Sequence, residues 1–418
     1  MKFNTVKQAQ AWIESITKFG EKYDLWRMEK ACELLGNPHQ TFKSVHVGGT
    51  NGKGSTVTFL AQMLHEAGYR VGVYTSPYIV HFNERIMINQ TMVDDATFLK
   101  HLNKIYTLEQ TFKENYHDQL TFFELLTLVA FNVFAEEDLD LVIVEVGLGG
   151  LLDATNVITP LLSVITTIGY DHMNVLGNNL SSILRNKLGI AKMNIPLVTG
   201  IQQQTLVKEV KKHASERQIP LTILREQPVE ESWFDGEQGF YFRGVPYTLS
   251  MLGLHQIDNA KTAILAAEEL EKLGYFLPLE AKLEGIKNAR WPGRFERFGH
   301  VILEGAHNEP GMKAACASLK SYFPTKKIIS VFTVMKDKDY EPMLNILESV
   351  SDEIIFTQID YPRCEYAETL KRKSSHPNTR ILMNHHELVK EVKAQTDAIV
   401  FITGSLYLIS AIRPYIAL

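Results

Sequence analysis

The run from Val45 to Ser55, which reads VHVGGTNGKGS, constrains the fold more than any other part of the chain. A β-rich stretch is followed by four glycines, a lysine and two hydroxyl residues, and a helical pattern begins at Thr56. Glycines permit tight turns whose N–H groups point inward, and the helix directs its positive end at the same point. The sequence therefore predicts a phosphate-binding loop over 49–55, with Lys53 against the phosphate oxygens.

This loop departs from the standard pattern GxxxxGK[ST] at two positions. Val47 stands where the pattern has its first glycine, and Gly54 stands where it has a hydroxyl, while Ser55 comes one residue late. The alternative is a glycine-rich turn without a ligand, but such a turn does not need a central lysine. Because no hydroxyl directly follows Lys53, we expect another part of the chain to supply the Mg²⁺ ligand that usually stands there.

The composition excludes several classes of protein. At 418 residues the chain exceeds what one hydrophobic core usually supports, so we expect two domains. A net charge of -5 argues against a general nucleic-acid or membrane-surface binder. No apolar stretch is long enough to cross a bilayer, and the N-terminus lacks the apolar run of a signal peptide. Three widely spaced cysteines without a CxxC pair indicate reduced thiols, so a cytoplasmic enzyme is expected.

Strand and helix patterns alternate along most of the chain. This alternation predicts an α/β fold: a P-loop-type, mostly parallel sheet with helices on both faces, followed by a smaller C-terminal α/β domain of Rossmann-like type. Residues 221–250 break the rhythm with aromatic and turn residues, which suggests a small antiparallel excursion. The alternation restarts after the WPGR run at 291–294. We therefore place an N-terminal nucleotide-binding domain at 1–293 and a C-terminal domain at 294–418.

Four predicted strands of the first domain end in glycine-rich or polar runs: Gly48–Ser55, Thr75-Ser76, Glu145-Val146-Gly147 and Asp171-His172. Parallel strands bring these ends to one edge of the sheet, where ligands of open α/β sheets bind. A nucleoside triphosphate needs Mg²⁺, for which Ser76 and Glu145 offer oxygen ligands, and His172 could complete a second, mixed site. A buried carboxylate such as Glu145 is costly unless it is paired or binds a metal. Ser76 could instead be a turn hydroxyl, and His172 an ordinary polar histidine.

Lys187 cannot be assigned a role from its spacing. It lies in the helical pattern SILRNKLGIAK at 182–192, and the spacing alone predicts a surface lysine.

An ordered series of motifs resembles the folylpolyglutamate synthase and dihydrofolate synthase branch of the Mur ligase superfamily. The resemblance begins with the variant phosphate loop at 49–55 and extends along nearly the whole chain. The further matches are YTSP (74–77), FNERI (82–86), EVGLGG (145–150) with DATN (153–156), DH (171–172), KLGI (187–190), HQ (255–256) with NA (259–260), WPGR (291–294), GAHN (305–308), KDKD (336–339) and TGSLY (403–407). Each motif is weak alone, whereas their order is specific.

The resemblance implies an ATP-dependent amide ligase. In this family the terminal carboxylate of a folate attacks the γ-phosphate of ATP, which gives an acyl phosphate and ADP. The amine of L-glutamate then displaces phosphate. Positioning and charge stabilisation suit such a reaction. ATP, L-glutamate and a reduced folate are thus the implied substrates of an enzyme that we expect to be a monomer.

The resemblance also implies roles for individual residues. The implied ATP-binding residues are Gly49, Thr50, Asn51, Gly52, Lys53, Gly54 and Ser55, together with Asn259, Arg294 and Glu304. Ser76 and Glu145 resemble the ligands of one Mg²⁺ and His172 that of a second. Lys53, His172 and Lys187 resemble catalytic residues, and Lys187 matches a lysine that is carbamylated in the family. His307 and Ser405 match positions on the glutamate side, in an arrangement that implies domain closure.

Two positions depart from the family pattern. Glu304 stands where members commonly have an aspartate before GAHN, which moves the carboxylate by one methylene. Leu151 stands where many members have an arginine. The first change affects the expected contact of Glu304 with the nucleotide, and the second affects the folate or phosphate surroundings near Leu151.

Other functions remain as alternatives. A dihydrofolate synthase, or a bifunctional enzyme that also adds glutamate to dihydropteroate, would carry the same motifs. A nucleotide-dependent switch of GTPase type would need an NKxD motif, but the two Asn-Lys pairs continue as NKIY (103–106) and NKLG (186–189). A cell-wall amino-acid ligase of the superfamily would not explain the matches at 82–86 and 291–294.

Overall fold

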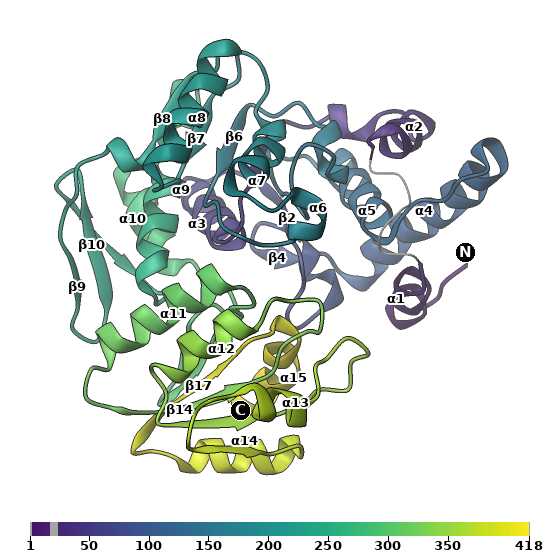
Figure 1. Ribbon diagram of the computed structural model, residues 1–418. Coiled ribbons are helices and arrows are strands. Elements are labelled where there is room, and N and C mark those ends of the chain that lie inside the picture. The colour runs from purple at the N-terminus through teal and green to yellow at the C-terminus, as the bar shows by residue number, and fades with distance from the viewer. Residues whose placement is uncertain (1, 17–23, 418) are drawn as a thin grey trace. The chain divides into compact units, whose positions relative to one another are not determined.

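The computed structural model describes residues 2–16 and 24–417, which form two compact units (Figure 1). The first unit comprises Met1–Ile168, His172–Pro228 and Asn259–Ile286, and the second comprises Gly169–Asp171, Val229–Asp258 and Lys287–Leu418. The second unit thus includes a segment that precedes the expected boundary at 293/294. Within the described residues, no helix combines the length and apolar character needed to span a bilayer.

The first unit is built on an eight-stranded sheet with the order β4-β3-β2-β5-β1-β6-β7-β8. The six strands from β2 to β8 in this order are parallel, and β3 and β4 extend one edge in antiparallel fashion. The strands are β1 (Ser44–Gly48), β2 (Val71–Tyr74), β3 (Ile86–Ile88), β4 (Thr91–Met92), β5 (Leu141–Glu145), β6 (Leu162–Ile165), β7 (Leu197–Thr199) and β8 (Leu221–Ile223). The predicted, mostly parallel sheet is confirmed.

The predicted antiparallel excursion at 221–250 is wrong at its beginning. Residues Leu221–Ile223 pair in parallel with β7 and complete the main sheet as β8. A strand of three residues is too short to show a recognisable pattern in the sequence.

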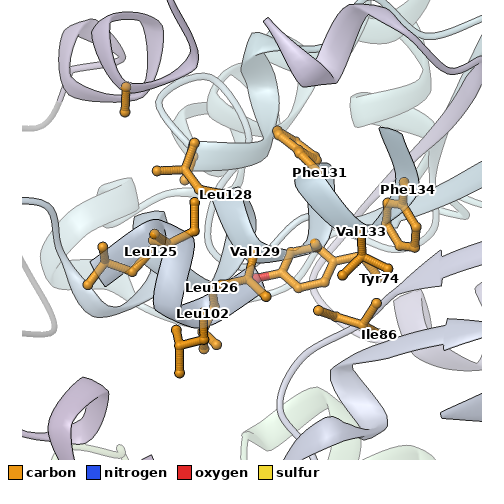
Figure 2. Packing of buried hydrophobic residues seen from close by; sticks show 14 of the residues in the cluster. Tyr74, Ile86, Leu102, Leu125, Leu126, Leu128, Val129, Phe131, Val133 and Phe134 are labelled. Carbon is orange, nitrogen blue, oxygen red and sulfur yellow. The ribbon is translucent and has the colours of Figure 1, made fainter. Parts of the chain in front are cut away.

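Helices cover this sheet and bury its apolar strands. The capping box of Thr121 and Glu124 begins α5 (Phe122–Glu136), whose buried face packs with α4 (Asp95–Tyr116) over Val142 and Val144 of β5. Figure 2 shows α5 side chains and Ile86 gathered around the buried ring of Tyr74. The other helices are α1 (Val6–Glu14), α2 (Trp26–Leu34), α3 (Lys53–Glu66), α6 (Met173–Leu176), α7 (Leu180–Lys187), α8 (Gln204–Glu216), α9 (Leu254–Lys272) and α10 (Leu279–Asn288).

A small antiparallel sheet explains why 229–258 belongs to the second unit. It consists of β9 (Ser232–Phe234), β10 (Gln238–Phe242) and β11 (Val245–Leu249). The Phe234 ring stacks on Tyr322 with 4.2 Å between ring centroids, and the Tyr322 hydroxyl donates to Gln238 Oε1 at 2.6 Å. Both contacts anchor the small sheet to α11 (Glu309–Tyr322).

The second unit also contains a six-stranded sheet with the order β12-β13-β17-β14-β15-β16, parallel except for β12. Its strands are β12 (Glu296–Phe298), β13 (Val301–Leu303), β14 (Lys327–Phe332), β15 (Glu353–Phe356), β16 (Thr379–Ile381) and β17 (Ala398–Thr403). The remaining helices are α12 (Glu341–Glu348), α13 (Ala367–Lys373), α14 (His385–Ala394) and α15 (Leu406–Ile416). The predicted C-terminal α/β domain is confirmed.

Candidate active site

The phosphate-binding loop has the backbone that its sequence predicts. β1 ends at Gly48, and α3 begins at Lys53 after Gly52, which has a φ of +85°. A Cβ atom on Gly49, whose φ is +144°, would meet the Thr166 hydroxyl at 1.9 Å. Gly54 and Ser55 lie buried in the first turn of α3. The helix therefore directs its N-terminal N–H groups at the loop, as an anion site requires.

Two threonines that sequence reasoning missed hold this loop in place. Thr167 accepts a hydrogen bond from Thr50 N at its carbonyl (2.7 Å) and one from Asn51 N at its hydroxyl (3.0 Å). The Thr166 hydroxyl donates to Asn51 O at 2.7 Å. The available signal was the Thr-Thr pair directly after the apolar run of β6, at the same sheet edge as the loop.

Lys53 and Lys187 meet at one backbone carbonyl. Lys53 Nζ donates to Gly49 O and to Thr50 O, both at 3.2 Å, and Lys187 Nζ donates to Gly49 O at 2.9 Å. Lys187 is only 4% exposed, so the surface position predicted from its spacing is wrong. Lys187 is the last residue of α7, and its side chain extends to the loop at Gly49 O. Because like charges repel, two ammonium groups on one carbonyl favour an anion beside them.

Ser76 and Glu145 also come together at this edge. Glu145 ends β5, is 4% exposed and accepts a hydrogen bond from Ser76 N at 3.2 Å. A buried carboxylate next to a hydroxyl residue suits Mg²⁺, which takes a few protein oxygens together with phosphate and water. The donor chemistry of this pair therefore fits the predicted metal.

His172 lies in the loop after β6, at the same sheet edge. It is exposed, has a φ of 48° and caps the short helix α6. Among the residues that the structure describes, no group of three or more His, Cys, Asp or Glu side chains forms a metal cluster. The second metal site therefore stays a prediction.

Asn259 lies against the phosphate-binding loop. A Cβ atom on Gly52 would meet Asn259 Oδ1 at 2.2 Å, so only glycine leaves room for this amide. The Asn259 side chain is buried and belongs to α9, at the residue where the chain returns to the first unit. The predicted ATP-binding residues of the first unit thus lie together.

The second unit holds Arg294 and Glu304 close to each other. Glu304 is 4% exposed and accepts a hydrogen bond from Phe295 N at 2.8 Å. Burial raises the pKa of Glu304 to about 7, although the Arg294 guanidinium opposes this shift. The extra methylene of glutamate, relative to the aspartate common in the family, therefore lies in a tight, buried setting.

An ionic cluster follows β13 in the second unit. Asp171 accepts from Lys338 Nζ at 2.8 Å and from Asn308 Nδ2 at 3.0 Å, and His307 Nε2 lies 3.9 Å from the same carboxylate. The other ring nitrogen of His307 lies 2.8 Å from Gly305 O. Burial and the Lys338 ammonium lower the pKa of His307, so its ring is neutral at pH 7. Roles for Asp171 and Lys338 were not predicted, although both stand in the motifs at 171–172 and 336–339.

Ser405 lies in the neighbouring loop of this edge. It is buried and caps α15, where its hydroxyl accepts from Tyr407 N at 3.1 Å. A Cβ atom on Gly305 would meet the Leu406 side chain at 2.1 Å, so the loops that carry His307 and Ser405 are in contact.

Comparison with family models gives two matches. Residues 47–267 match the Mur ligase middle domain, and residues 293–406 match the glutamate ligase domain of Mur ligases. The first match covers the phosphate-binding loop and Asn259, and the second covers Arg294, His307 and Ser405.

Named relatives cover nearly the whole chain. The dihydrofolate synthase/folylpolyglutamate synthase of Bacillus subtilis is 40% identical over 98% of this chain and 99% of its own. A structure of E. coli FolC in complex with DHPP and ADP has a TM-score of 0.86 and 27% identity, covering 99% of this chain and 98% of that chain. A folylpolyglutamate synthase of Mycobacterium tuberculosis, complexed with ADP and AMPPCP, has a TM-score of 0.88 and 26% identity over 99% of this chain and 98% of that one. This chain belongs to the Mur ligase family of ATP-dependent acid–amino-acid ligases, in the branch of dihydrofolate synthases and folylpolyglutamate synthases.

Proposed function

We propose that this enzyme adds L-glutamate to the terminal carboxylate of a reduced folate, with ATP converted to ADP and phosphate. The observation that carries the proposal is the glycine loop at the N-terminus of α3, in which Lys53 Nζ lies 3.2 Å from both Gly49 O and Thr50 O. Such a point stabilises the charge that moves during phosphoryl transfer.

The first step forms an acyl phosphate. A carboxylate oxygen of the folate attacks the γ-phosphorus, and the bond from that phosphorus to the β-phosphate oxygen breaks, so that ADP leaves. Lys53 and the loop N–H groups balance the negative charge that shifts toward ADP. Ser76 and Glu145 would hold one Mg²⁺ and His172 a second ion, and these ions would supply further positive charge at the phosphates.

Lys187 is proposed to act as a carbamate. Carbamylation would turn a cation into an anion and exchange the donation to Gly49 O for oxygens that can bind a metal. The position of Lys187 supports this proposal, because its buried side chain reaches the loop that would hold the phosphates.

The second unit is proposed to serve the nucleotide and the amino acid. Arg294 and Glu304, with Asn259 of the first unit, are proposed to contact ATP. His307 and Ser405 are proposed to contact L-glutamate, whose amine attacks the acyl carbonyl and expels phosphate. The neutral ring of His307 can accept a hydrogen bond from that amine, which a protonated ring could not.

Addition of the first glutamate to dihydropteroate is a second candidate activity. The Bacillus subtilis relative is named for both activities, and the E. coli structure holds DHPP. The motifs of this chain are common to both branches, so both acceptors deserve a test. We further propose that the enzyme is a monomer of the cytoplasm.

An activity assay tests the proposal and separates the candidates. Purified protein receives ATP, Mg²⁺ and L-glutamate with either tetrahydrofolate or dihydropteroate, and phosphate and glutamylated product are measured. Product with tetrahydrofolate alone indicates a folylpolyglutamate synthase, and product with both indicates a bifunctional enzyme. Release of AMP and pyrophosphate, or no product with either acceptor, would refute the proposed function.

A further inference from the structure

A pair of cations beyond the end of β14 has no role in the function proposed above. Segments 334–336 and 363–365 are joined by one isolated antiparallel β-bridge, in which Met335 lies opposite Cys364. Lys336 N donates to Arg363 O at 2.8 Å, and Glu365 N donates to Val334 O at 2.9 Å. This register places Lys336 opposite Arg363, so that the two side chains leave the same face of the paired segments.

Like charges directly opposite each other destabilise a strand pair. An anion between the two side chains would remove that cost. Asp337 supplies part of the compensation, since Arg363 Nη1 lies 3.3 Å from its carboxylate. This ion pair is exposed on both sides, so a carboxylate from a ligand can compete for the arginine at little cost.

Aromatic rings contact both cationic side chains and restrict their positions. Arg363 lies over the ring of Tyr361 and donates to the hydroxyls of Tyr361 and Tyr407 at 3.4 Å each. The rings of Tyr361 and Tyr407 are themselves stacked, with 4.3 Å between centroids. Lys336 Nζ lies 4.3 Å from the ring centroid of the exposed Tyr366. Fixed side chains lose less conformational freedom when a ligand binds.

The pair lies at the edge that carries the ionic cluster. Lys336 precedes Lys338 by two residues after β14, and Tyr407 follows Ser405 by two residues after β17, the neighbour of β14. Ligands of parallel sheets bind at this carboxyl edge. An anion held by Lys336 and Arg363 would therefore share the edge with a group bound at His307 and Ser405.

We propose that Lys336 and Arg363 form a carboxylate subsite that takes a carboxylate of a glutamyl group. Guanidinium groups recognise carboxylates with paired hydrogen bonds, and an ammonium group adds charge. The carboxylate can come from the incoming L-glutamate or from the glutamyl tail of the folate. This inference rests on the proposed function for its choice of ligand.

Steady-state kinetics test the subsite. The variants Arg363→Gln and Lys336→Gln are compared with Arg372→Gln, an exposed arginine on α13 that serves as the control. The KM for L-glutamate is measured first, and then the KM for tetrahydrofolates with one and with four glutamates. Loss of a charge-assisted contact should raise the affected KM about 10-fold or more, with kcat and the KM for ATP nearly unchanged.

Each result identifies the source of the carboxylate or overturns the subsite. A raised KM for L-glutamate assigns the incoming amino acid, and a raised KM for the tetraglutamate only assigns the tail. Asp337→Asn, which removes the competing carboxylate, should lower the same KM. If Arg363→Gln and Lys336→Gln change neither KM more than Arg372→Gln does, and Asp337→Asn also has no effect, the subsite is refuted.

Direct binding keeps this test separate from the proposed function. If the wild-type enzyme makes no glutamylated product, the proposed function fails, but the subsite can still be measured by titration calorimetry with a tri-γ-glutamate peptide. The wild-type protein should bind the peptide, and the variant that carries both substitutions should bind it at least about 10-fold more weakly. Equal binding would overturn the subsite whatever the enzyme catalyses. Thermal melting and Arg363→Lys, which retains the charge, show whether a loss reflects misfolding.

Discussion

The carboxyl edges of the two sheets differ in the groups that they offer to a ligand. In the first unit the site consists of backbone N–H groups, glycines at positive φ and buried side chains such as Lys187 and Glu145. In the second unit it consists of side chains such as His307, Lys338 and Arg363, which remain partly open to solvent and are positioned by other side chains. The first construction suits phosphate chemistry that is common to a family, and the second allows the selected substrate to change through few substitutions.

The largest effect should come from Lys53. Lys53→Ala removes a charge from the loop, and we expect turnover to fall by about 1,000-fold or more, measured as phosphate release. The Lys53 ammonium donates hydrogen bonds to two carbonyls of its own loop, so its loss should change the thermal unfolding midpoint little. A near-normal rate would show that the loop is not the site of phosphoryl transfer.

Substitution of Lys187 should cause a large loss of kcat that added carboxylates partly restore. Lys187→Ala should lower kcat by roughly 100-fold, because the proposed carbamate would be gone. Short-chain carboxylates such as acetate should partly restore the rate by occupying the vacated position. Absence of rescue at every concentration would argue against the carbamate and leave Lys187 as a cation beside Gly49 O.

Two glycines of the first unit separate backbone strain from steric conflict. Gly52 and Gly68 have φ values of +85° and +91°, but a Cβ atom meets Asn259 at 2.2 Å only in the first case and nothing within 4 Å in the second. The positive φ should make either alanine substitution cost about 1–2 kcal/mol of unfolding free energy, and the conflict with Asn259 adds to this cost at Gly52. Only Gly52→Ala should also raise the KM for ATP, by roughly 10-fold or more. Equal KM values for the two variants would contradict the placement of Asn259 at the nucleotide.

Glu304 should make the stability of the folded protein depend on pH. The folded protein retains this proton up to about pH 7, whereas the ordinary pKa of glutamic acid is 4.5. The folded state therefore binds more protons between these values, and the unfolding free energy falls as the pH rises from 4.5 to 7 and levels off above. Over this range the loss is on the order of 3 kcal/mol.

Glu304→Gln should avoid that loss, because its amide oxygen can still accept from Phe295 N. Denaturant unfolding at several pH values should show equal stability near pH 4.5 and a more stable variant at pH 8. A difference that does not vary with pH would mean that Glu304 is ionised in the folded protein.

The sequence was sufficient to predict that the polar ends of the strands lie at one edge of the sheet, but not which residues hold those ends in place. Glycine spacing, the lysine and the apolar runs placed the phosphate loop, Ser76 and Glu145 at one edge, because parallel strands align their ends. The burial of Lys187 could not be predicted from its local sequence, because it depends on a contact with Gly49, which is 138 positions away in the chain. The supports from Thr166 and Thr167 likewise arise from a pairing of β1 with β6 that no local pattern specifies.

In the second unit, the sequence located the loops but not the ion pairs. The motifs at 305–308 and 336–339 were recognised as family features, yet the contact of Asp171 with Lys338 joins residues 167 positions apart. The position of Lys336 opposite Arg363 depends on an isolated β-bridge outside the regular strands, which hydrophobic periodicity cannot reveal.

Transfer of labelled oxygen tests the acyl phosphate, on which the proposed chemistry of both edges depends. Tetrahydrofolate carrying ¹⁸O in its terminal carboxylate is incubated with the enzyme, ATP, Mg²⁺ and L-glutamate, and the released phosphate is examined by ³¹P NMR. If the carboxylate attacks the γ-phosphorus and the amine then expels phosphate, one labelled oxygen must appear in each phosphate. Phosphate without label, formed together with glutamylated product, would contradict the account.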